Sequence, residues 1–488
     1  MMYLRDTLSG QLKEFNSEDN KVKLYVCGIT PYSTAHVGHA RSTITFDVLR
    51  RYLEFIGFEV QHVQNFTDID DKIIIRAREE SISYKELSAR YMQEYIRDME
   101  RLNVLPAHKY PLATEAIPRI INIVEQLMVK GYAYENNGDV YFSVGKCANY
   151  GQLSNRSIDD MIAGSRVEIS EQKRHPMDFA LWKASKPGEP YWESPWGNGR
   201  PGWHIECTTI CLDNLGETID IHGGGLDLVF PHHENELAQS ESFTDKDPFV
   251  RFWVHNGLLN LQDQKMSKSI GHLVSIGAAL EKYKPDLIRL FFLSAHYRSP
   301  LNYSDQSLIN LDKGLDRLLA ALRINSHTDF EQLDSIPFEG KFIESMNDDL
   351  NTPQAIGILF ELAHEINRAH LNNMAVSEAQ KMLNKLGGIL GLKFNQSTGT
   401  GTNLEDEVFV LYKQVSKMIE PGNDQGLSNL ITAADSKNLD SMMDALVAIR
   451  IKLRNANSYD LADLIRDTLA KLSLIIEDNP ESSRWRWK

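Results

Sequence analysis

Two short motifs restrict most strongly what this chain can fold into. The first, HVGH, occupies residues 36–39 between a predicted strand and a predicted helix, and the second, KMSKS, occupies residues 265–269, about half the chain later. Each motif is short enough to occur by chance, but both in this order, with a βα unit under the first, make a rare combination. Together they predict an α/β domain that gathers imidazole and ammonium groups where a polyphosphate would need them.

The residues around HVGH predict a strand, a helix and a second strand. Residues 22–27 (VKLYVC) form a short apolar run typical of a buried strand, and Gly28 then allows a turn. The helix is indicated by an apolar stripe at helical spacing, formed by Phe46, Leu49, Leu53 and Ile56. Gly57 ends this helix, and residues 59–63 resume strand character. This order predicts the start of a parallel α/β sheet.

The two motifs carry groups suited to binding phosphate. A helix N-terminus has free N–H groups and about half a positive charge, and His36 and His39 could add donors in its first turn. KMSKS places Lys265 and Lys268 on a loop that could close over a triphosphate and follow charge onto departing pyrophosphate. The alternatives are a pair of surface or N-capping histidines and a solvated basic loop. The joint occurrence of the motifs favours the phosphate site.

The α/β pattern is interrupted and then resumes. Residues 116–186 mix helix and short strand signals and look like an insertion, whereas 218–222 and 250–255 are again predicted strands. In open α/β sheets, ligands bind at the carboxyl ends of the strands. We therefore expect the two halves to build one site, which includes three residues placed at such ends: Cys27, His222 and Asn256.

The last part of the chain is predicted to be helical. Strand signals stop at about Ala278, and helical periodicity covers 308–322, 354–370 and 379–390. Residues 395–406 form a polar linker rich in Gly and Thr. Two or three more helices are expected between this linker and a basic C-terminal tail.

A second set of residues has the chemistry of a metal site. His232 and Glu236 lie four residues apart on a helix predicted to start near Pro231, and share one face of it. Thiolate, imidazole and carboxylate are the ligands that Zn²⁺ takes, normally four in a tetrahedron. Spacing alone does not choose among Cys27, Cys207, Cys211, His232, His233 and Glu236. The alternative is an ordinary buried helix without a metal, with Cys211 as a small core residue.

Composition narrows the class of protein. The chain is 42% hydrophobic and 24% charged, and no apolar run approaches the roughly 20 residues that span a bilayer. Residues 1–25 have neither a signal core nor a transit-peptide composition, so we expect a cytoplasmic protein without a membrane partner. Four cysteines do not make a disulfide framework. The net charge of −15 argues against non-specific nucleic-acid binding but not against a local basic surface.

With these motifs in place, the chain resembles a known family. Its segments are similar to the successive sequence blocks of the cysteinyl-tRNA synthetases, in the order YVCGITPY, HVGHARS, NFTDIDDKI, GWHIECT, DIHGGGLDLVFPHHENELAQ, KMSKS and LFFLSAHYRSPLNYS. The resemblance runs from about Leu24 to Ser304. It continues more weakly to the C-terminus, where MNDDLNTPQA and LADLIRDTLAKL resemble that family's helical domains.

The resemblance implies the fold of a class I aminoacyl-tRNA synthetase. Such a chain has a Rossmann-like catalytic domain of the α/β class, split by a connective insertion and followed by an all-α helical bundle and an anticodon-binding domain. The expected division is 1–115 and 201–260 for the catalytic halves, 116–200 for the insertion, 261–305 for the KMSKS loop and stem-contact segment, 306–394 for the bundle, 395–404 for the linker and 405–488 for the anticodon-binding domain.

The resemblance also assigns the metal and amino-acid sites. It implies one zinc ion per chain, with ligands at Cys27, Cys207, His232 and Glu236, which leaves Cys211 and His233 as supporting or packing residues. Three further residues match family positions that line the amino-acid pocket: Thr30, Trp203 and His222. For Trp203 the alternative is plain core packing.

The implied activity is cysteine–tRNA ligation. ATP with Mg²⁺ would activate L-cysteine to cysteinyl-adenylate and pyrophosphate, and the cysteine would then pass to the 3′-terminal adenosine of tRNA(Cys). ATP would be bound by His36, Gly38, His39 and Lys268. His36 and His39 would contact its phosphates, and Lys265 and Lys268 would act on the pyrophosphate side. Soft sulfur binds Zn²⁺ as a thiolate whereas a serine hydroxyl resists deprotonation, so zinc would select the substrate without an editing domain. Nothing in the sequence suggests an obligate dimer, and a monomer is expected.

The C-terminal tail and two rival functions complete the predictions. Arg484 and Arg486 could pair with tRNA phosphates while Trp485 and Trp487 stack on unpaired bases, the alternative being a frayed tail with two docked aromatic rings.

One rival function is that of a mycothiol-type ligase, which joins cysteine to an amino sugar and resembles a shortened form of this chain. The other is a non-catalytic tRNA-binding paralogue, which typically loses one of the two motifs. The residues after the linker weigh against the first, and the intact motifs against the second.

Overall fold

The computed structural model describes two compact units, an N-terminal unit within Met1–Phe394 and a C-terminal unit within Asn395–Lys488. The described residues are 1–17, 19–164, 173–261, 274–326, 331–394, 404–418, 439–456, 458–472, 474–478 and 483–487. The KMSKS motif, with Lys265 and Lys268, therefore lies outside the described residues, as does most of the predicted linker. The finer domain division stays a prediction.

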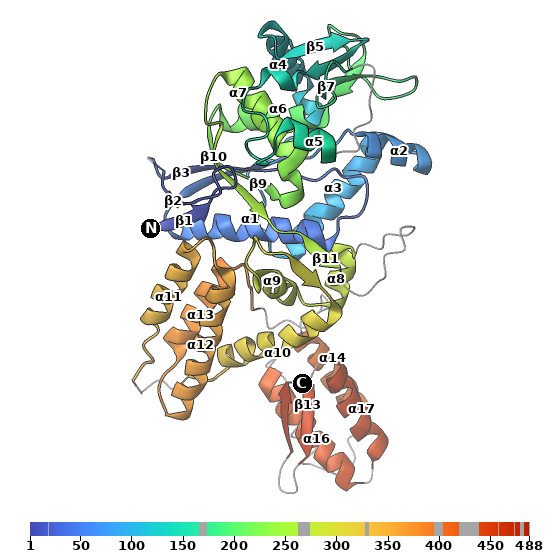
Figure 1. Ribbon diagram of the computed structural model, residues 1–488. Coiled ribbons are helices and arrows are strands. Elements are labelled where there is room, and N and C mark those ends of the chain that lie inside the picture. Colours follow the sequence, from blue (N-terminus) through green and yellow to red (C-terminus); the bar gives the residue numbers. More distant parts are fainter. Residues whose placement is uncertain are drawn as a thin grey trace. The chain divides into compact units, whose positions relative to one another are not determined.

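A four-stranded parallel sheet forms the centre of the N-terminal unit (Figure 1). Its spatial order is β10 (Val250–Asn256), β9 (Ile219–Gly225), β3 (Lys21–Val26) and β4 (Glu59–Gln64). The buried side chains of β3 alternate, because Val22 and Leu24 join the core that includes α1 (Val37–Phe55), whereas Tyr25 joins the core that includes α6 (Trp203–Leu215). Helices thus cover both faces, as is usual for a parallel sheet. The predicted strand–helix–strand order is confirmed.

One sequence expectation about this sheet was wrong. His222 lies inside β9 rather than at its end, because β9 continues through the three glycines to Gly225. At Gly223 an added Cβ would lie 2.2 Å from the ring of Phe46 on α1. Glycine therefore lets α1 pack directly onto the strand, and the glycines extend the strand instead of ending it.

The segment between the two halves of the sheet folds as a layer of its own. It consists of α4 (Ile117–Val129), α5 (Ile158–Gly164) and an antiparallel sheet of β5 (Ala133–Asn136), β6 (Asp139–Phe142), β7 (Phe179–Ala184) and β8 (Gly199–Pro201). Its buried residues, such as Trp182 and Phe142, share one core with α6. The insertion therefore packs on the α6 side of the central sheet.

The remaining elements of the N-terminal unit flank this sheet and end in a helical bundle. They are β1 (Met2–Arg5), β2 (Leu12–Phe15), α2 (Asp71–Glu80), α3 (Tyr84–Arg101), α7 (Glu234–Thr244), β11 (Leu259–Leu261), α8 (Ile276–Lys282), α9 (Pro285–Leu293), β12 (Leu301–Tyr303), α10 (Asp305–Leu322), α11 (Ile336–Asn347), α12 (Thr352–Leu371) and α13 (Ser377–Ile389), with short helical turns at Ala113–Ala116, Val144–Lys146, Leu226–Leu228 and Val229–His233. The predicted helices at 308–322, 354–370 and 379–390 are confirmed as α10, α12 and α13. The expectation that strands stop at about Ala278 was wrong, because β12 pairs with β11.

The C-terminal unit is helical but ends in a hairpin. Helices α14 (Leu404–Met418), α16 (Leu439–Asn455) and α17 (Tyr459–Lys471) share an apolar core, to which Leu474 of β13 contributes. β13 (Leu474–Asp478) pairs antiparallel with β14 (Ser483–Trp487), so that Trp485 is opposite Ile476. The backbone of Arg484, Trp485 and Arg486 thus lies in a strand, so the alternative of a frayed tail was wrong. The expectation of helices followed by a basic tail did not include this strand. Period-2 alternation in SRWRW was the signal for this strand.

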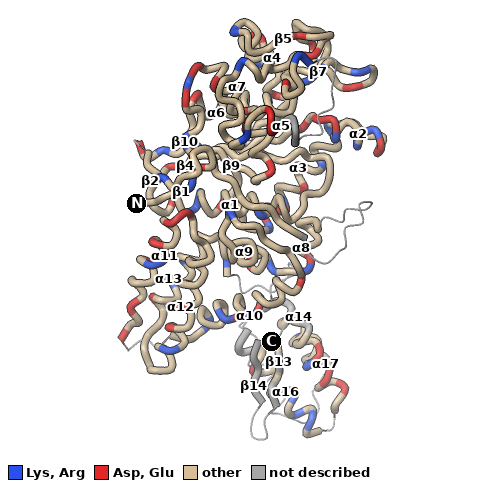
Figure 2. The backbone as a smooth tube through the Cα atoms, in the orientation of Figure 1, with Lys and Arg blue, Asp and Glu red and all other residues tan. Residues whose placement is uncertain are grey.

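Charge is spread over the surface rather than gathered in long runs. Figure 2 shows Lys and Arg interspersed with Asp and Glu on the helices of the N-terminal unit. Among the described helices, none is both long and apolar enough to cross a lipid bilayer.

A buried arginine joins α1 to the bundle. Arg289 on α9 has no exposed surface and pairs with Asp47 of α1. Its remaining N–H groups donate to the carbonyls of Leu102 and Leu390, each 3.0 Å away, just past the ends of α3 and α13. These carbonyls have no partner within their own helices. Arg289 therefore satisfies two helix ends and one buried carboxylate at a single point.

We predict that Arg289→Met destabilises the N-terminal unit by about 3 kcal/mol, because the substitution leaves a buried carboxylate and two buried carbonyls short of donors. The urea midpoint followed by intrinsic fluorescence measures this loss. Lys341→Met is the matched control, since it removes a lysine whose partner Glu361 is exposed, and it should leave the midpoint nearly unchanged. Equal midpoints for both variants would contradict the prediction.

Candidate functional site

Two thiols, an imidazole and a carboxylate from separate segments lie together at the carboxyl end of the central sheet. Cys27 directly follows β3, and Cys207 lies on α6. His232 lies in the turn before α7, and Glu236 lies in the first turn of α7. The backbone N–H of Cys27 donates to the carbonyl of Gly223 on β9, 3.2 Å away. The neighbouring strands thus fix the first thiol.

The ligand atoms of these four residues all lie within 4.8 Å of one another. Cys27 Sγ is 3.8 Å from Cys207 Sγ and 3.3 Å from Glu236 Oε1, and Glu236 Oε1 is 3.0 Å from His232 Nε2. The last distance confirms that His232 and Glu236 share a helix face. Cys207, His232 and Glu236 are buried, with at most 2% of their surface exposed, while Cys27 is partly exposed.

This arrangement fits a tetrahedral zinc ion. Two sulfur atoms bonded at about 2.3 Å to one tetrahedral ion lie about 3.8 Å apart, and a nitrogen and an oxygen bonded at about 2.1 Å lie about 3.4 Å apart. The observed separations, 3.8 Å for the sulfurs and 3.0 Å for His232 and Glu236, are close to both values. The donor set S₂NO is also one that Zn²⁺ accepts.

The electrostatics of the cluster favour bound positive charge. Burial raises the pKa of Cys27 well above its usual value, whereas the hydrogen bond from Cys27 lowers the pKa of Cys207 to about 6. Burial alone would lower the pKa of His232, but the charges of Glu236 and Cys207 outweigh it and raise the pKa to about 10. Burial opposes ionisation of Glu236, yet His222 and His232 hold its pKa well below the usual range. The cluster is a buried anionic site.

Asn65, which sequence reasoning did not identify, supports this cluster. It is fully buried just after β4, and its Oδ1 accepts from the Gly28 N–H at 2.9 Å and from the Tyr25 hydroxyl at 3.1 Å. The same Oδ1 is 3.7 Å from Cys207 Sγ. The carbonyl of Asn65 lies where a Cβ on Gly28 would be, 1.6 Å away. Asn65 therefore holds both cysteine-bearing segments, and its place at the carboxyl end of a predicted strand was the available signal.

Two residues expected in the amino-acid pocket, His222 and Trp203, lie beside the cluster. His222 Nε2 is 3.0 Å from Glu236 Oε2, and the Trp203 ring lies 4.4 Å from the His232 ring. Trp203 is 40% exposed, so the alternative that it is plain core is wrong. Thr30 follows Cys27 in the loop after β3 and is partly exposed.

HVGH starts helix α1 as predicted, and its histidines do cap the helix. His36 is the N-cap residue, and its Nδ1 accepts from the Gly38 N–H at 3.1 Å. His39 Nδ1 accepts from the His36 N–H at 3.2 Å, and the two rings stack 3.8 Å apart. Burial lowers the pKa of His39 to about 3. A neutral ring that accepts at Nδ1 carries its proton on Nε2.

The capping alternative and the phosphate prediction are therefore compatible. Capping uses Nδ1 of each ring, which leaves both Nε2–H groups as donors. Gly38 is required because an added Cβ would lie 2.9 Å from the His36 ring. No acidic residue stands in the first turn of α1, so the positive end of the helix keeps its field.

The segment after KMSKS is fastened to this helix start. The Val37 N–H donates to Val274, and the Ile276 N–H donates to Ala35, each at 3.0 Å. The first described residues after the motif thus lie beside HVGH.

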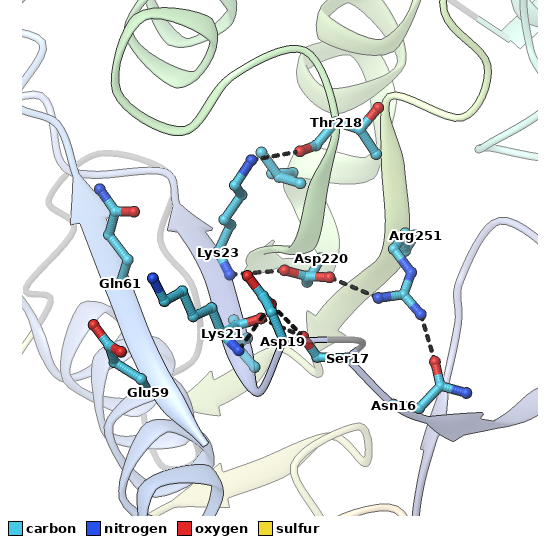
Figure 3. A pocket seen from close by; sticks show the side chains of 12 residues that line it. Asn16, Ser17, Asp19, Lys21, Lys23, Glu59, Gln61, Thr218, Asp220 and Arg251 are labelled. Atoms are coloured by element: carbon cyan, nitrogen blue, oxygen red, sulfur yellow. Dashed lines mark hydrogen bonds and ion pairs between the residues drawn. The ribbon is translucent and has the colours of Figure 1, made fainter.

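A separate pocket of about 670 Å³ lies at the amino-terminal end of the strands, away from the cluster (Figure 3). It is lined by residues at the amino-terminal ends of the strands, including Lys21, Glu59 and Ile219. Its Asp220 is already paired, because it accepts from the Lys23 N–H and from Arg251. The pocket is remote from Cys27 along β3 and is not part of the site.

Comparison with known proteins identifies the family. A profile for the catalytic domain of class I (C) tRNA synthetases matches residues 13–313, and a DALR domain profile matches residues 341–395. The cysteine–tRNA ligases of Dehalococcoides mccartyi and Persephonella marina are 46% and 45% identical to this chain, over 100% and 99% of both its length and theirs. The cysteine–tRNA ligase of Aquifex aeolicus is 44% identical over 99% of this chain and 98% of its own.

A solved structure shares the fold. Mycobacterium tuberculosis methionyl-tRNA synthetase in complex with methionyl-adenylate aligns with a TM-score of 0.57 at 14% identity, over 77% of this chain and 88% of that one. On the sequence relatives and the matched catalytic domain, the chain belongs to the cysteine–tRNA ligase family of class I aminoacyl-tRNA synthetases.

Proposed function

We propose that this chain activates L-cysteine with ATP and transfers it to tRNA(Cys), and that a bound zinc ion selects the amino acid by its sulfur. The named relatives support the overall reaction. The observation that carries the finer proposal is the S₂NO cluster of Cys27, Cys207, His232 and Glu236 at the edge where α1 begins.

Zinc would be held by those four residues, and when bound it supplies a soft Lewis acid that takes a thiolate far more readily than a hydroxyl. A purely apolar pocket would separate cysteine from serine by only about 10²-fold. His222 and Trp203 flank the cluster and would line the space for the amino acid. Because zinc would bind the thiolate of cysteine and not the hydroxyl of serine, a separate editing site would be unnecessary.

The activation step would rely on positioning and charge. The cysteine carboxylate attacks the α-phosphorus of ATP, the bond to the bridging oxygen breaks, and pyrophosphate leaves. The Nε2–H groups of His36 and His39 donate to the phosphates at the N-terminus of α1, and Mg²⁺ accompanies the ATP. Lys268 and Lys265, outside the described residues, would take charge on the pyrophosphate side. No covalent enzyme intermediate is needed.

The second step passes cysteine to the 2′-hydroxyl of the terminal adenosine, and residues 405–488 would contact the anticodon. Arg484, Trp485 and Arg486 are the proposed contacts on β14. We further propose a cytoplasmic monomer. A mycothiol-type ligase would join cysteine to an amino sugar instead of to tRNA. A non-catalytic paralogue would show no cysteine-dependent ATP–pyrophosphate exchange. The acceptor and the exchange reaction together distinguish all three.

We predict that Cys207→Ser weakens zinc binding and raises the KM for cysteine far more than the KM for ATP, because the substitution removes a metal donor and leaves the α1 end intact. Chelator competition and exchange kinetics measure the two effects. Equal loss of cysteine and ATP binding would contradict the assignment.

Asn65→Ala should lower zinc affinity by about 10–100-fold, the usual effect of removing a group that orients metal ligands. Thr67→Val is the matched control, because it removes the hydroxyl 3.3 Å from Asn65 Nδ2 and keeps the Oδ1 contacts. Zinc affinity by competition with a chromophoric chelator is the readout. An Asn65→Ala protein that holds zinc like the wild type would show that Asn65 is only a packing residue.

A pair of variants at His39 separates capping from phosphate binding. His39→Asn keeps an acceptor near the Nδ1 position but lacks the distal N–H, whereas His39→Gln keeps a distal donor. We expect ATP–pyrophosphate exchange to fall by about 10²-fold in His39→Asn and less in His39→Gln. The reverse order would leave His39 with the capping role alone.

A further inference from the structure

The buried cluster contains more donors than the proposed zinc site uses. His222 on β9 and His233 before α7 are both fully buried. A nitrogen of each, together with Cys27 Sγ and an oxygen of Glu236, forms a second set of four ligand atoms within 4.8 Å of one another. We call Cys27, Cys207, His232 and Glu236 the outer set, and Cys27, His222, His233 and Glu236 the inner set.

The two shared residues face both sets with separate contacts. Glu236 directs Oε1 to His232 of the outer set and Oε2 to His222 of the inner set, each at 3.0 Å. Cys27 Sγ lies 3.8 Å from Cys207 on one side and 3.3 Å from His233 Nε2 on the other. Glu236 Oε1 also lies 3.9 Å from His233 Nε2, so only the Oε2 contact is specific to the inner set. A carboxylate that contacts both sets and a thiolate between them are suited to bridging two cations.

One inner histidine, His233, is oriented by contacts that do not involve the outer set. His233 Nδ1 is 2.7 Å from His255 Nε2, and His255 Nδ1 is 2.8 Å from the Thr7 hydroxyl. These two contacts orient the ring of His233 so that its other nitrogen faces Cys27. Metal-binding histidines are commonly oriented in this way by a partner at the second nitrogen. An added Cβ on Gly224 would lie 2.7 Å from His233 Cε1, so glycine makes room for the ring.

Ordinary core packing does not account for the inner set. Buried imidazoles normally have both nitrogens paired with polar groups. His222 Nδ1 is buried without a hydrogen-bond partner among the described residues, and its ring stacks on Trp253 at 4.5 Å. His233 Nε2 faces the thiol of Cys27 at 3.3 Å.

We propose that the inner set, Cys27, His222, His233 and Glu236, binds a second thiophilic divalent cation such as Zn²⁺, Co²⁺ or Cd²⁺, bridged to the first through Cys27 and Glu236. The donors S, N, N and O suit this class of ion. If the proposed function holds, His222 belongs to the amino-acid pocket, and the second cation competes with cysteine. The inner site is then an inhibitory one.

The test is a titration of the metal-free full-length protein with Co²⁺, following the bound equivalents and the thiolate-to-cobalt charge-transfer absorption. The wild type should bind two equivalents, each adding to this absorption, and His233→Asn should bind one. Cys147→Ser is the matched control, since Cys147 lies outside the cluster, and it should still bind two. If His233→Asn does not fold, His222→Gln takes its place.

One bound equivalent in the wild type, or a second that persists in both inner-set variants, would overturn the proposal. A kinetic experiment then tests the consequence. Excess Zn²⁺ should raise the KM for cysteine in ATP–pyrophosphate exchange, and His233→Asn should abolish this inhibition. Absence of exchange in all preparations would refute the proposed function but not the second site, which the titration judges alone.

Discussion

The arrangement of the candidate site depends on one buried carboxylate, that of Glu236. Glu236 has no exposed surface, and an ionised group in that position is stable only if donors or cations surround it. His222 and His232 each approach one of its oxygens at 3.0 Å, and Cys27 lies 3.3 Å away. These partners come from three different parts of the chain. The order of strands β9 and β3, in which His222 is opposite Tyr25, is what brings them together.

The carboxyl end of the sheet also carries the start of α1, which is the proposed phosphate site. β3 ends just before Cys27, and α1 begins at Val37 after one loop. The proposed function requires that a substrate bound to the cluster by its side chain present its carboxylate near the N-terminus of α1. Asn65, just after β4, also fixes this loop, because its side chain accepts a hydrogen bond from the backbone N–H of Gly28. In the proposed function, the loop between β3 and α1 would thus link selection of sulfur to activation by ATP.

Sequence reasoning reached the sheet because strands depend on local patterns. For the cluster, spacing left six candidate ligands, and the family resemblance chose four of them. Apolar runs predict the strands, and the four-residue spacing of His232 and Glu236 predicts their shared face. It could not find Asn65, whose role comes from contacts to residues distant in the chain. It misplaced the end of β9, because glycine commonly ends strands but here makes room for Phe46. It also missed β12, since a strand of three residues carries little pattern. It overlooked the strand that ends at Trp487, although the alternation in SRWRW was available. The roles of Lys265 and Lys268 stay predictions.

The measurement that tests the central claim most directly is X-ray absorption at the zinc edge, on protein loaded with one equivalent of zinc. Without substrate, Cys27 and Cys207 should give two sulfur neighbours at about 2.3 Å. Addition of L-cysteine should raise the sulfur count to three, and L-serine should leave it at two. A sulfur count that does not change with L-cysteine would contradict selection of the substrate through its thiolate.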